Sequence, residues 1–264
     1  MFIAMIKMEM VPADHNVKVG DECGNKNANV TEDTLFLFEG KPVGFYINKI
    51  EGKLKELLLI ANKEFRSTNV PKQDLTRSNR DFQGVSAKGQ EVVQYSTILG
   101  SVPPRTGRGR AYPVISSVHQ HKTARTFIKS MMLLSREAEV LVKKNLPEIY
   151  QKQKEVILEN VPEKWRFSPL YTSSISNYNI AANFHRDTGN LKDTVNCIFT
   201  KRFDATGGYL NVPDYDVTVE CADNSLLCYP AWRNVHGVTP IQICSSQGYR
   251  NSLIFYPLKG FDGY

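Results

Sequence analysis

The sequence predicts an α+β protein, because its two halves carry different hydrophobic periods. Residues 51–65 and 124–145 have apolar side chains at intervals of three and four, which indicates helices lying on a core. From residue 170 onward, short β-type runs recur every ~8–12 residues, the spacing of a sandwich or barrel. We therefore expect a double-stranded β-helix (jelly-roll) core, with the N-terminal helices packed on its larger sheet.

The N-terminal half supplies the first elements. Residues 1–33 have Gly, Asn and Asp clusters without a clear period, which predicts a loosely structured N-terminal arm. Residues 34–264 are expected to form one domain, divided into a helical and loop part (34–169) and a jelly-roll core (170–264). Within the first part, two β-type runs at 34–38 and 43–47 flank a short turn, as in a hairpin.

The rest of this half combines a long loop with two helices. Residues 67–113 are polar and rich in Gly, Pro and Arg, so we expect mainly loop with a short strand near 92–99. A loop of this length favours a functional role. Thr123 is the expected N-cap of the helix that follows it, and Pro147 separates that helix from a second one ending near residue 159.

The expected strands of the C-terminal half alternate with turn residues. They span residues 173–184, 194–199, 208–212, 217–220, 225–229, 238–243 and 252–256.

Two imidazoles and one carboxylate form the first candidate site. His185 and Asp187 lie two residues apart, so both side chains lie on one face of a strand. His236 follows after enough chain to cross a sheet and return. This ligand set binds Fe(II) on one face and leaves the opposite face open. Either motif alone is weak, since a lone strand histidine is usually structural, but the ordered set favours iron.

A basic residue follows the third ligand. The fork of Arg250 suits the distal carboxylate of an organic acid, and Ser252 lies on the same strand face. An iron triad followed by a carboxylate-binding arginine indicates a 2-oxoglutarate-dependent dioxygenase, with Fe(II), 2-oxoglutarate as co-substrate and O₂. An ordinary surface arginine is the alternative.

Charge suggests the partner. The net charge is +6, and no acidic residue lies between Val92 and Arg136. Such a segment suits a polyanion such as DNA, and the alternative is a solvated surface loop. Its seven basic residues are Arg105, Arg108, Arg110, Lys122, Arg125, Lys129 and Arg136.

Other compositional features restrict the setting. Five cysteines without a CxxC pair disfavour a disulfide scaffold or zinc cluster and fit an intracellular, reducing compartment. That compartment would be the nucleus in a eukaryote or the host cytoplasm for a virus. We expect no membrane span, no secretory signal and no obligate protein partner.

Two blocks resemble the TET/JBP family of nucleic-acid-base oxygenases. His185-Arg186-Asp187-Thr188-Gly189-Asn190 looks like the family's iron-binding strand, and Arg250-Asn251-Ser252-Leu253-Ile254-Phe255-Tyr256 is similar to its R-x-S-L-x-F-Y signature. The resemblance covers residues 173–259 and indicates a minimal catalytic module, such as phages, protists or algae encode. It implies a flipped pyrimidine, hydrogen-bonded by Asn190 with Tyr256 beside the ring.

One departure concerns the base. Leu258 stands where methylcytosine oxidases of this family have a histidine, so a hydrogen bond to the base edge is missing or supplied by another residue. We place 5-methylcytosine, oxidised to 5-hydroxymethylcytosine or further, first and thymine second. A 2-oxoglutarate oxygenase of protein or small molecules, or a jelly-roll binding module without chemistry, are the alternatives.

The remaining candidates lie in the acid-free segment. Arg105 is the candidate for an additional arginine directed at 2-oxoglutarate, and Arg108 and Arg110 are candidates for DNA contacts. His119 and His121 are interpreted as DNA-facing or helix-capping, because no carboxylate nearby would complete a second metal site.

Overall fold

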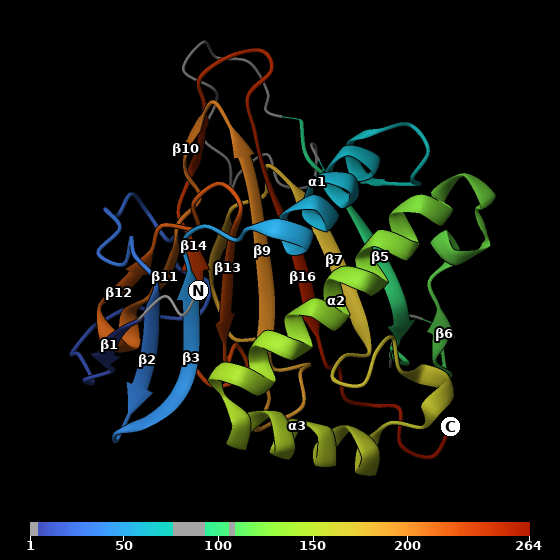
Figure 1. Ribbon diagram of the computed structural model, residues 1–264, viewed down its shortest axis with the longest axis horizontal. Coiled ribbons are helices and arrows are strands. Elements are labelled where there is room, and N and C mark those ends of the chain that lie inside the picture. Colours follow the sequence, from blue (N-terminus) through green and yellow to red (C-terminus); the bar gives the residue numbers. More distant parts are fainter. Residues whose placement is uncertain (1–4, 76–92, 106–108) are drawn as a thin grey trace.

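The computed structural model describes residues 5–75, 93–105 and 109–264, and a large twisted sheet runs through it (Figure 1). In the described part of the chain this sheet has ten strands in the order β1-β2-β3-β13-β9-β16-β7-β5-β4, with β6 paired to β5. The strands are β1 (Ile6–Glu9), β2 (Thr34–Phe38), β3 (Lys41–Ile47), β13 (Ser225–Tyr229), β9 (Asn196–Phe203), β16 (Tyr249–Tyr256), β7 (Ser173–Tyr178), β5 (Tyr95–Val102), β4 (Gln73–Asp74) and β6 (Val114–Ile115).

A smaller sheet faces the large one. Its order is β12-β11-β14-β8, and a separate pair joins β10 to β15. These two sheets confirm the predicted α+β class with a jelly-roll core. The strands are β12 (Val217–Val219), β11 (Leu210–Val212), β14 (His236–Val238), β8 (Ala182–His185), β10 (Ala205–Gly207) and β15 (Ile241–Ile243).

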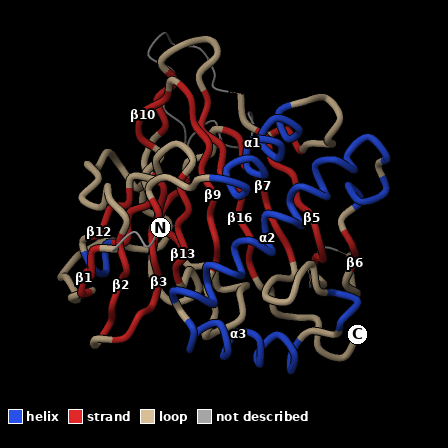
Figure 2. The backbone as a smooth tube through the Cα atoms, viewed as in Figure 1, coloured by secondary structure: helices blue, strands red, loops and turns tan. Residues whose placement is uncertain are grey.

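Three helices cover the other face of the large sheet, as Figure 2 shows. They are α1 (Gly52–Arg66), α2 (Arg125–Asn145) and α3 (Pro147–Asn160). Their apolar side chains share one core with Phe199, Leu253 and Phe255 of the sheet. Because strand residues alternate between faces, Ile198, Ser252 and Ile254 point the other way, toward the small sheet.

Two expected strands are each divided between sheets. The run 173–184 breaks into β7 and β8 at Asn179, which adopts a left-handed φ of 55°. Asn179 donates its backbone N–H to the carbonyl of Arg250 and accepts the N–H of Arg250 on its side chain. The run 238–243 breaks into β14 and β15 around Pro240, which has no N–H for a ladder.

Two N-terminal expectations need correction. Within the arm, β1 pairs in parallel with β2 and Cys23 is buried, whereas residues 10–29 form no helix or strand and are mostly exposed, as expected. Thr123 is not the N-cap of α2, since Ala124 holds that position and the Thr123 hydroxyl donates to the Asn69 carbonyl. The expected strand near 92–99 is β5, and Val92 lies outside the described residues.

None of the helices in the described ranges has the length and apolar character that a membrane-spanning segment needs.

Candidate active site

The small sheet brings the two predicted histidines together. His185 ends β8 and His236 begins β14, and the two residues are direct partners in the antiparallel register. Their ring centroids lie 4.3 Å apart. Asp187 joins them, its Oδ1 3.5 Å from His185 Nε2 and 3.9 Å from His236 Nε2. All three potential ligand atoms lie within 4.8 Å of one another, a spacing that one metal ion can bridge.

Backbone carbonyls orient both rings. The Nδ1–H of His185 donates to the Asn183 carbonyl at 2.7 Å, and that of His236 donates to the Asn234 carbonyl at 3.0 Å. Each Nε2 lone pair is therefore directed at the shared centre, as in metal-bound histidines. Burial, and after it the charge of His185, lowers the pKa of His236 to about 4. The neutral imidazole that ligates a metal is thus the dominant form at pH 7.

Two amides hold the carboxylate. Asn196, on β9, donates its Nδ2–H to Asp187 Oδ2 at 3.0 Å. Asn190 donates to Asn196 Oδ1 at 2.9 Å and to Asp187 Oδ2 at 3.5 Å. Sequence reasoning missed Asn196, although it lies in the strand just after the iron-binding block. Asn190, predicted to contact a base, lines the cavity, but its amide hydrogens already serve this network.

A cavity of about 420 Å³ opens between the sheets at the triad. Four residues of β16 at alternate positions line it, because their side chains share one strand face. They are Arg250, Ser252, Ile254 and Tyr256.

Arg250 lies at the buried part of this wall. It is 3% exposed and burial lowers its pKa, while its Nε has no hydrogen-bond partner. No carboxylate among the described residues forms an ion pair with it. Gly208 lies so close that a Cβ there would be 3.0 Å from Arg250 Nε. A buried guanidinium without an ion-pair partner fits an anionic ligand such as the distal carboxylate of 2-oxoglutarate.

Tyr256 and Leu258 line the wall nearer to Asp187. Burial chiefly raises the pKa of Tyr256, Asp187 raises it further and Arg105 lowers it. Arg105 is exposed, and its charge acts on Tyr256 in this part of the cavity, so its contact with 2-oxoglutarate stays a prediction. Leu258 forms an isolated bridge with Asn190 and also contacts the apolar cluster around Phe261.

The fold divides the acid-free segment. Lys129 and Arg136 are on α2, on the face of the large sheet opposite the cavity, while Arg105 is near the cavity. Arg108 lies outside the described residues. Arg110 is committed to its own loop, donating to the Pro103 carbonyl. The segment is therefore not one continuous basic surface.

The two histidines of this segment lie away from the cavity lining. His119 Nε2 accepts the Gly100 N–H at 2.9 Å, and burial lowers its pKa. This bond ties the 3₁₀ turn Ser117–Gln120 to β5, which is a structural role. His121 is exposed and makes no side-chain capping bond to the turn after it.

Two further residues support the third ligand and were not predicted. The ring of Tyr229 meets His236 edge-on at 5.3 Å. Asp214 accepts hydrogen bonds from the loop that precedes His236. Asp214 lies on a different segment of the chain from His236, and Tyr229 ends the strand before the loop to His236, so no helix or strand period connects either residue with it.

Two histidines and one carboxylate on a single cavity wall leave one side of a metal open, the arrangement of non-haem Fe(II) oxygenases. The solved structure of NgTET1 in complex with 5mC DNA shares the fold, with a TM-score of 0.60 and 13% identity over 94% of this chain and 84% of that one.

Two other structures are more distant. A 2OG-Fe(II) oxygenase family oxidoreductase from Burkholderia pseudomallei has 11% identity and a TM-score of 0.42 over 81% of this chain and 84% of that one. A full-length Neurospora crassa protein in complex with alpha-KG has 11% identity and a TM-score of 0.41, over 84% and 77%. The sequence itself matches no protein-family model and no curated protein.

Proposed function

We propose that this chain is a 2-oxoglutarate- and Fe(II)-dependent dioxygenase that oxidises the 5-methyl group of a pyrimidine base in DNA, with 5-methylcytosine as the first choice. The observation that carries the proposal is the joint placement of the triad and the buried Arg250 on one cavity of about 420 Å³. The three ligands are spaced to hold a metal, and the guanidinium supplies the charge that a dicarboxylate needs.

The triad and the residues around it have distinct roles in the proposed reaction. Fe(II), when bound by His185, Asp187 and His236, supplies the activation of O₂ with 2-oxoglutarate that hydroxylates a C–H bond. Arg250 and Ser252 bind the distal carboxylate and so fix the orientation of the co-substrate. Asn196 keeps the Asp187 carboxylate turned toward the histidines.

A base must leave the duplex to reach this cavity. A pyrimidine methyl group lies in the major groove and cannot approach buried ligands unless the nucleotide is extruded. Tyr256 and Leu258 would then flank the ring beside Asp187. Exposed Arg186 lines the cavity mouth, and exposed Lys259 follows Leu258, so both are placed to contact phosphates. The fold similarity to NgTET1, solved with 5mC DNA, supports the same substrate class.

Thymine is the second candidate, because Leu258 weakens the discrimination between the two bases. An apolar side chain packs on a ring but cannot read its Watson–Crick edge, so cytosine and thymine rings are poorly distinguished at this position. The remaining polar group beside the ring, Asn190, is engaged by Asn196 and Asp187.

Nucleoside mass spectrometry tests both choices. The protein is incubated with Fe(II), 2-oxoglutarate and either methylated or unmethylated DNA, with Asp187→Ala as the inactive control. Hydroxymethylcytosine from methylated DNA alone supports the first choice, and hydroxymethyluracil from either DNA supports the second. Succinate without either base product overturns the substrate, and no succinate above the Asp187→Ala control overturns the oxygenase.

A further inference from the structure

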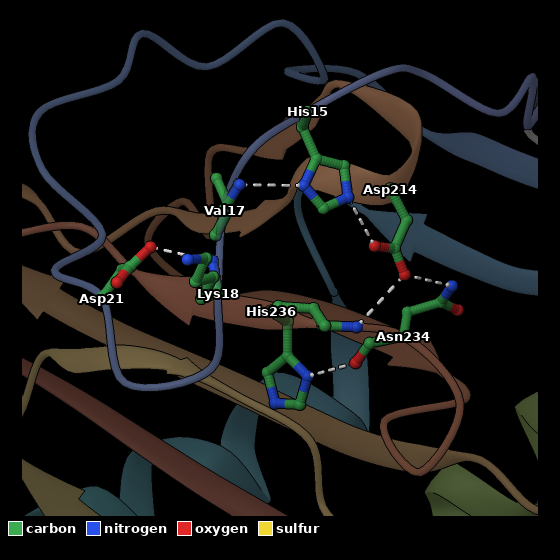
Figure 3. Close-up of polar contacts among 8 residues, drawn as sticks. His15, Val17, Lys18, Asp21, Asp214, Asn234 and His236 are labelled. Carbon is green, nitrogen blue, oxygen red and sulfur yellow. Dashed lines mark hydrogen bonds and ion pairs between the residues drawn. The ribbon is translucent and has the colours of Figure 1, made fainter.

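The N-terminal segment 15–23, here called the strap, hydrogen-bonds to β8, which ends at His185, and to Asp214. Figure 3 shows part of it beside Asp214, Asn234 and His236. The strap contacts the loop before His236 through one side chain and the strand of His185 through its backbone. Nothing in the sequence of this segment suggests a link to the metal site more than 160 residues away.

The first contact passes through Asp214. The Val17 N–H donates to His15 Nδ1, so His15 Nε2 carries a proton and donates it to Asp214 Oδ1 at 2.9 Å. The other carboxylate oxygen, Oδ2, accepts from Asn234 Nδ2 at 3.1 Å and from the Val235 N–H at 3.2 Å. The carbonyl of this same Asn234 accepts the Nδ1–H of His236. One carboxylate thus connects the strap to the residue that orients His236.

The second contact covers β8. This strand lies at the edge of the small sheet, where its outer backbone groups would otherwise be unpaired. The Gly20 N–H donates to the Phe184 carbonyl at 2.8 Å, and the Phe184 N–H donates to the Asp21 carbonyl at 2.9 Å. The Asn183 side chain donates to the Gly20 carbonyl at 3.0 Å. The carbonyl of Asn183 is the group that orients His185.

An apolar contact closes the strap over the sheet. Cys23 packs with Phe184 and Val235, the residues just before each histidine, and Val17 joins them. Gly237 lies under this cluster, where a Cβ would be 3.1 Å from Cys23 Sγ. Because neighbouring strand residues face opposite ways, the strap holds the sheet face that is opposite the ligands.

We propose that the strap positions both histidine ligands from behind, and that Asp214 is the positioning residue through which it acts on His236. The inference rests on the proposed function for the metal site. It adds that metal affinity depends on a segment that contributes no ligand, because outer hydrogen bonds orient ligand rings.

Asp214→Asn tests this with a matched control. Whichever way the new amide turns, its NH₂ group faces a donor, either His15 Nε2–H or the Asn234 and Val235 N–H groups. Asp216→Asn makes the same change two residues away, where the exposed side chain has no hydrogen bond in the described structure and Asn tolerates the left-handed φ of 50°. Mn(II) affinity is measured by electron paramagnetic resonance of free Mn(II), and Tm is measured on the metal-free proteins.

The expected result is Mn(II) binding weakened about 10-fold or more in Asp214→Asn and unchanged in Asp216→Asn. His15→Ala should weaken binding as well, and the double variant His15→Ala/Asp214→Asn should be no worse than Asp214→Asn alone, because both remove one connection. Wild-type Mn(II) affinity in Asp214→Asn with a lowered metal-free Tm would overturn the strap proposal and leave the metal site intact. Absence of Mn(II) binding by the wild type would instead overturn the metal site itself.

Discussion

The amide of Asn196 donates to Asp187 Oδ2 at 3.0 Å. A residue of the large sheet therefore holds a candidate metal ligand that comes just after β8, a strand of the small sheet. Both residues line the cavity, so this bond links the two layers at the triad. Asn190 completes the arrangement by donating to Asn196 Oδ1.

Asn196→Ala should weaken Mn(II) or Fe(II) binding about 10–100-fold. Without this hydrogen bond the Asp187 side chain can rotate, and metal binding must then fix its orientation. Anaerobic metal titration measures the effect. Asn145→Ala, at the end of α2, is the control and should bind metal as the wild type does. Equal affinities in the two variants would show that Asp187 is held by other contacts.

Arg250→Ala should raise the KM for 2-oxoglutarate, because it removes a charge-assisted hydrogen bond of roughly 1.5–3 kcal/mol, equivalent to roughly 10–150-fold. Arg250→Lys keeps the charge without the fork and should be intermediate. Succinate formation against 2-oxoglutarate concentration gives both values. An unchanged KM in Arg250→Ala would remove this residue from the co-substrate site.

Gly208→Ala should also raise that KM and lower Tm, because the new methyl group would lie 3.0 Å from both Arg250 Nε and Ile241 Cγ1. The position also has a φ of +68°, which penalises any side chain. Gly40→Ala, at a φ of +72° with open space around it, shares that backbone penalty without the contact. A KM raised equally in both variants would contradict a specific effect on Arg250.

Arg186→Ala and Lys259→Ala should each weaken DNA binding and reduce the slope of log K against log salt by about 1, if each contacts one phosphate at the cavity mouth. Lys129→Ala and Arg136→Ala, on the opposite face of the large sheet, should change neither quantity. Fluorescence anisotropy at several salt concentrations measures both. A slope that depends on Lys129 and Arg136 instead would place DNA on α2.

Glu139→Gln should raise Tm at pH 7–8. Burial raises the pKa of Glu139, so its charged form costs stability in the folded state, while its Oε1 accepts the Leu170 N–H. Below the unfolded-state pKa of about 4.3, Glu139 is protonated in both states and costs no stability. As pH rises through its higher folded-state pKa, the buried carboxylate becomes charged and destabilises the folded protein. The gain should therefore disappear near pH ~4. Glu137→Gln, which removes an exposed pair with Lys53, should give no gain, and calorimetry across pH compares the two.

Short-range patterns were enough for some features. The period of α2 and the alternation along β16 depend on near neighbours in the chain, so both were predicted closely. That alternation alone predicts that Arg250 and Ser252 share one strand face, and both residues line the cavity. The spacing of His185 and Asp187 is equally local.

Other features depended on contacts between distant segments. Asn179 ends β7 because it bonds to Arg250, and this contact sends β8 to the other sheet. Asn190 supports Asp187 because Asn196 is its neighbour in space.

The sequence by itself determined which residues can ligate a metal and bind a carboxylate, since these are properties of side-chain type and local spacing. Only the tertiary structure decided that His185 and His236 are cross-strand partners and that α2 carries Lys129 and Arg136 away from the cavity. It alone placed His15 and Asp214 behind the ligands. The physical reason is that sheet pairing and packing depend on residues far apart along the chain, whose proximity no local period encodes.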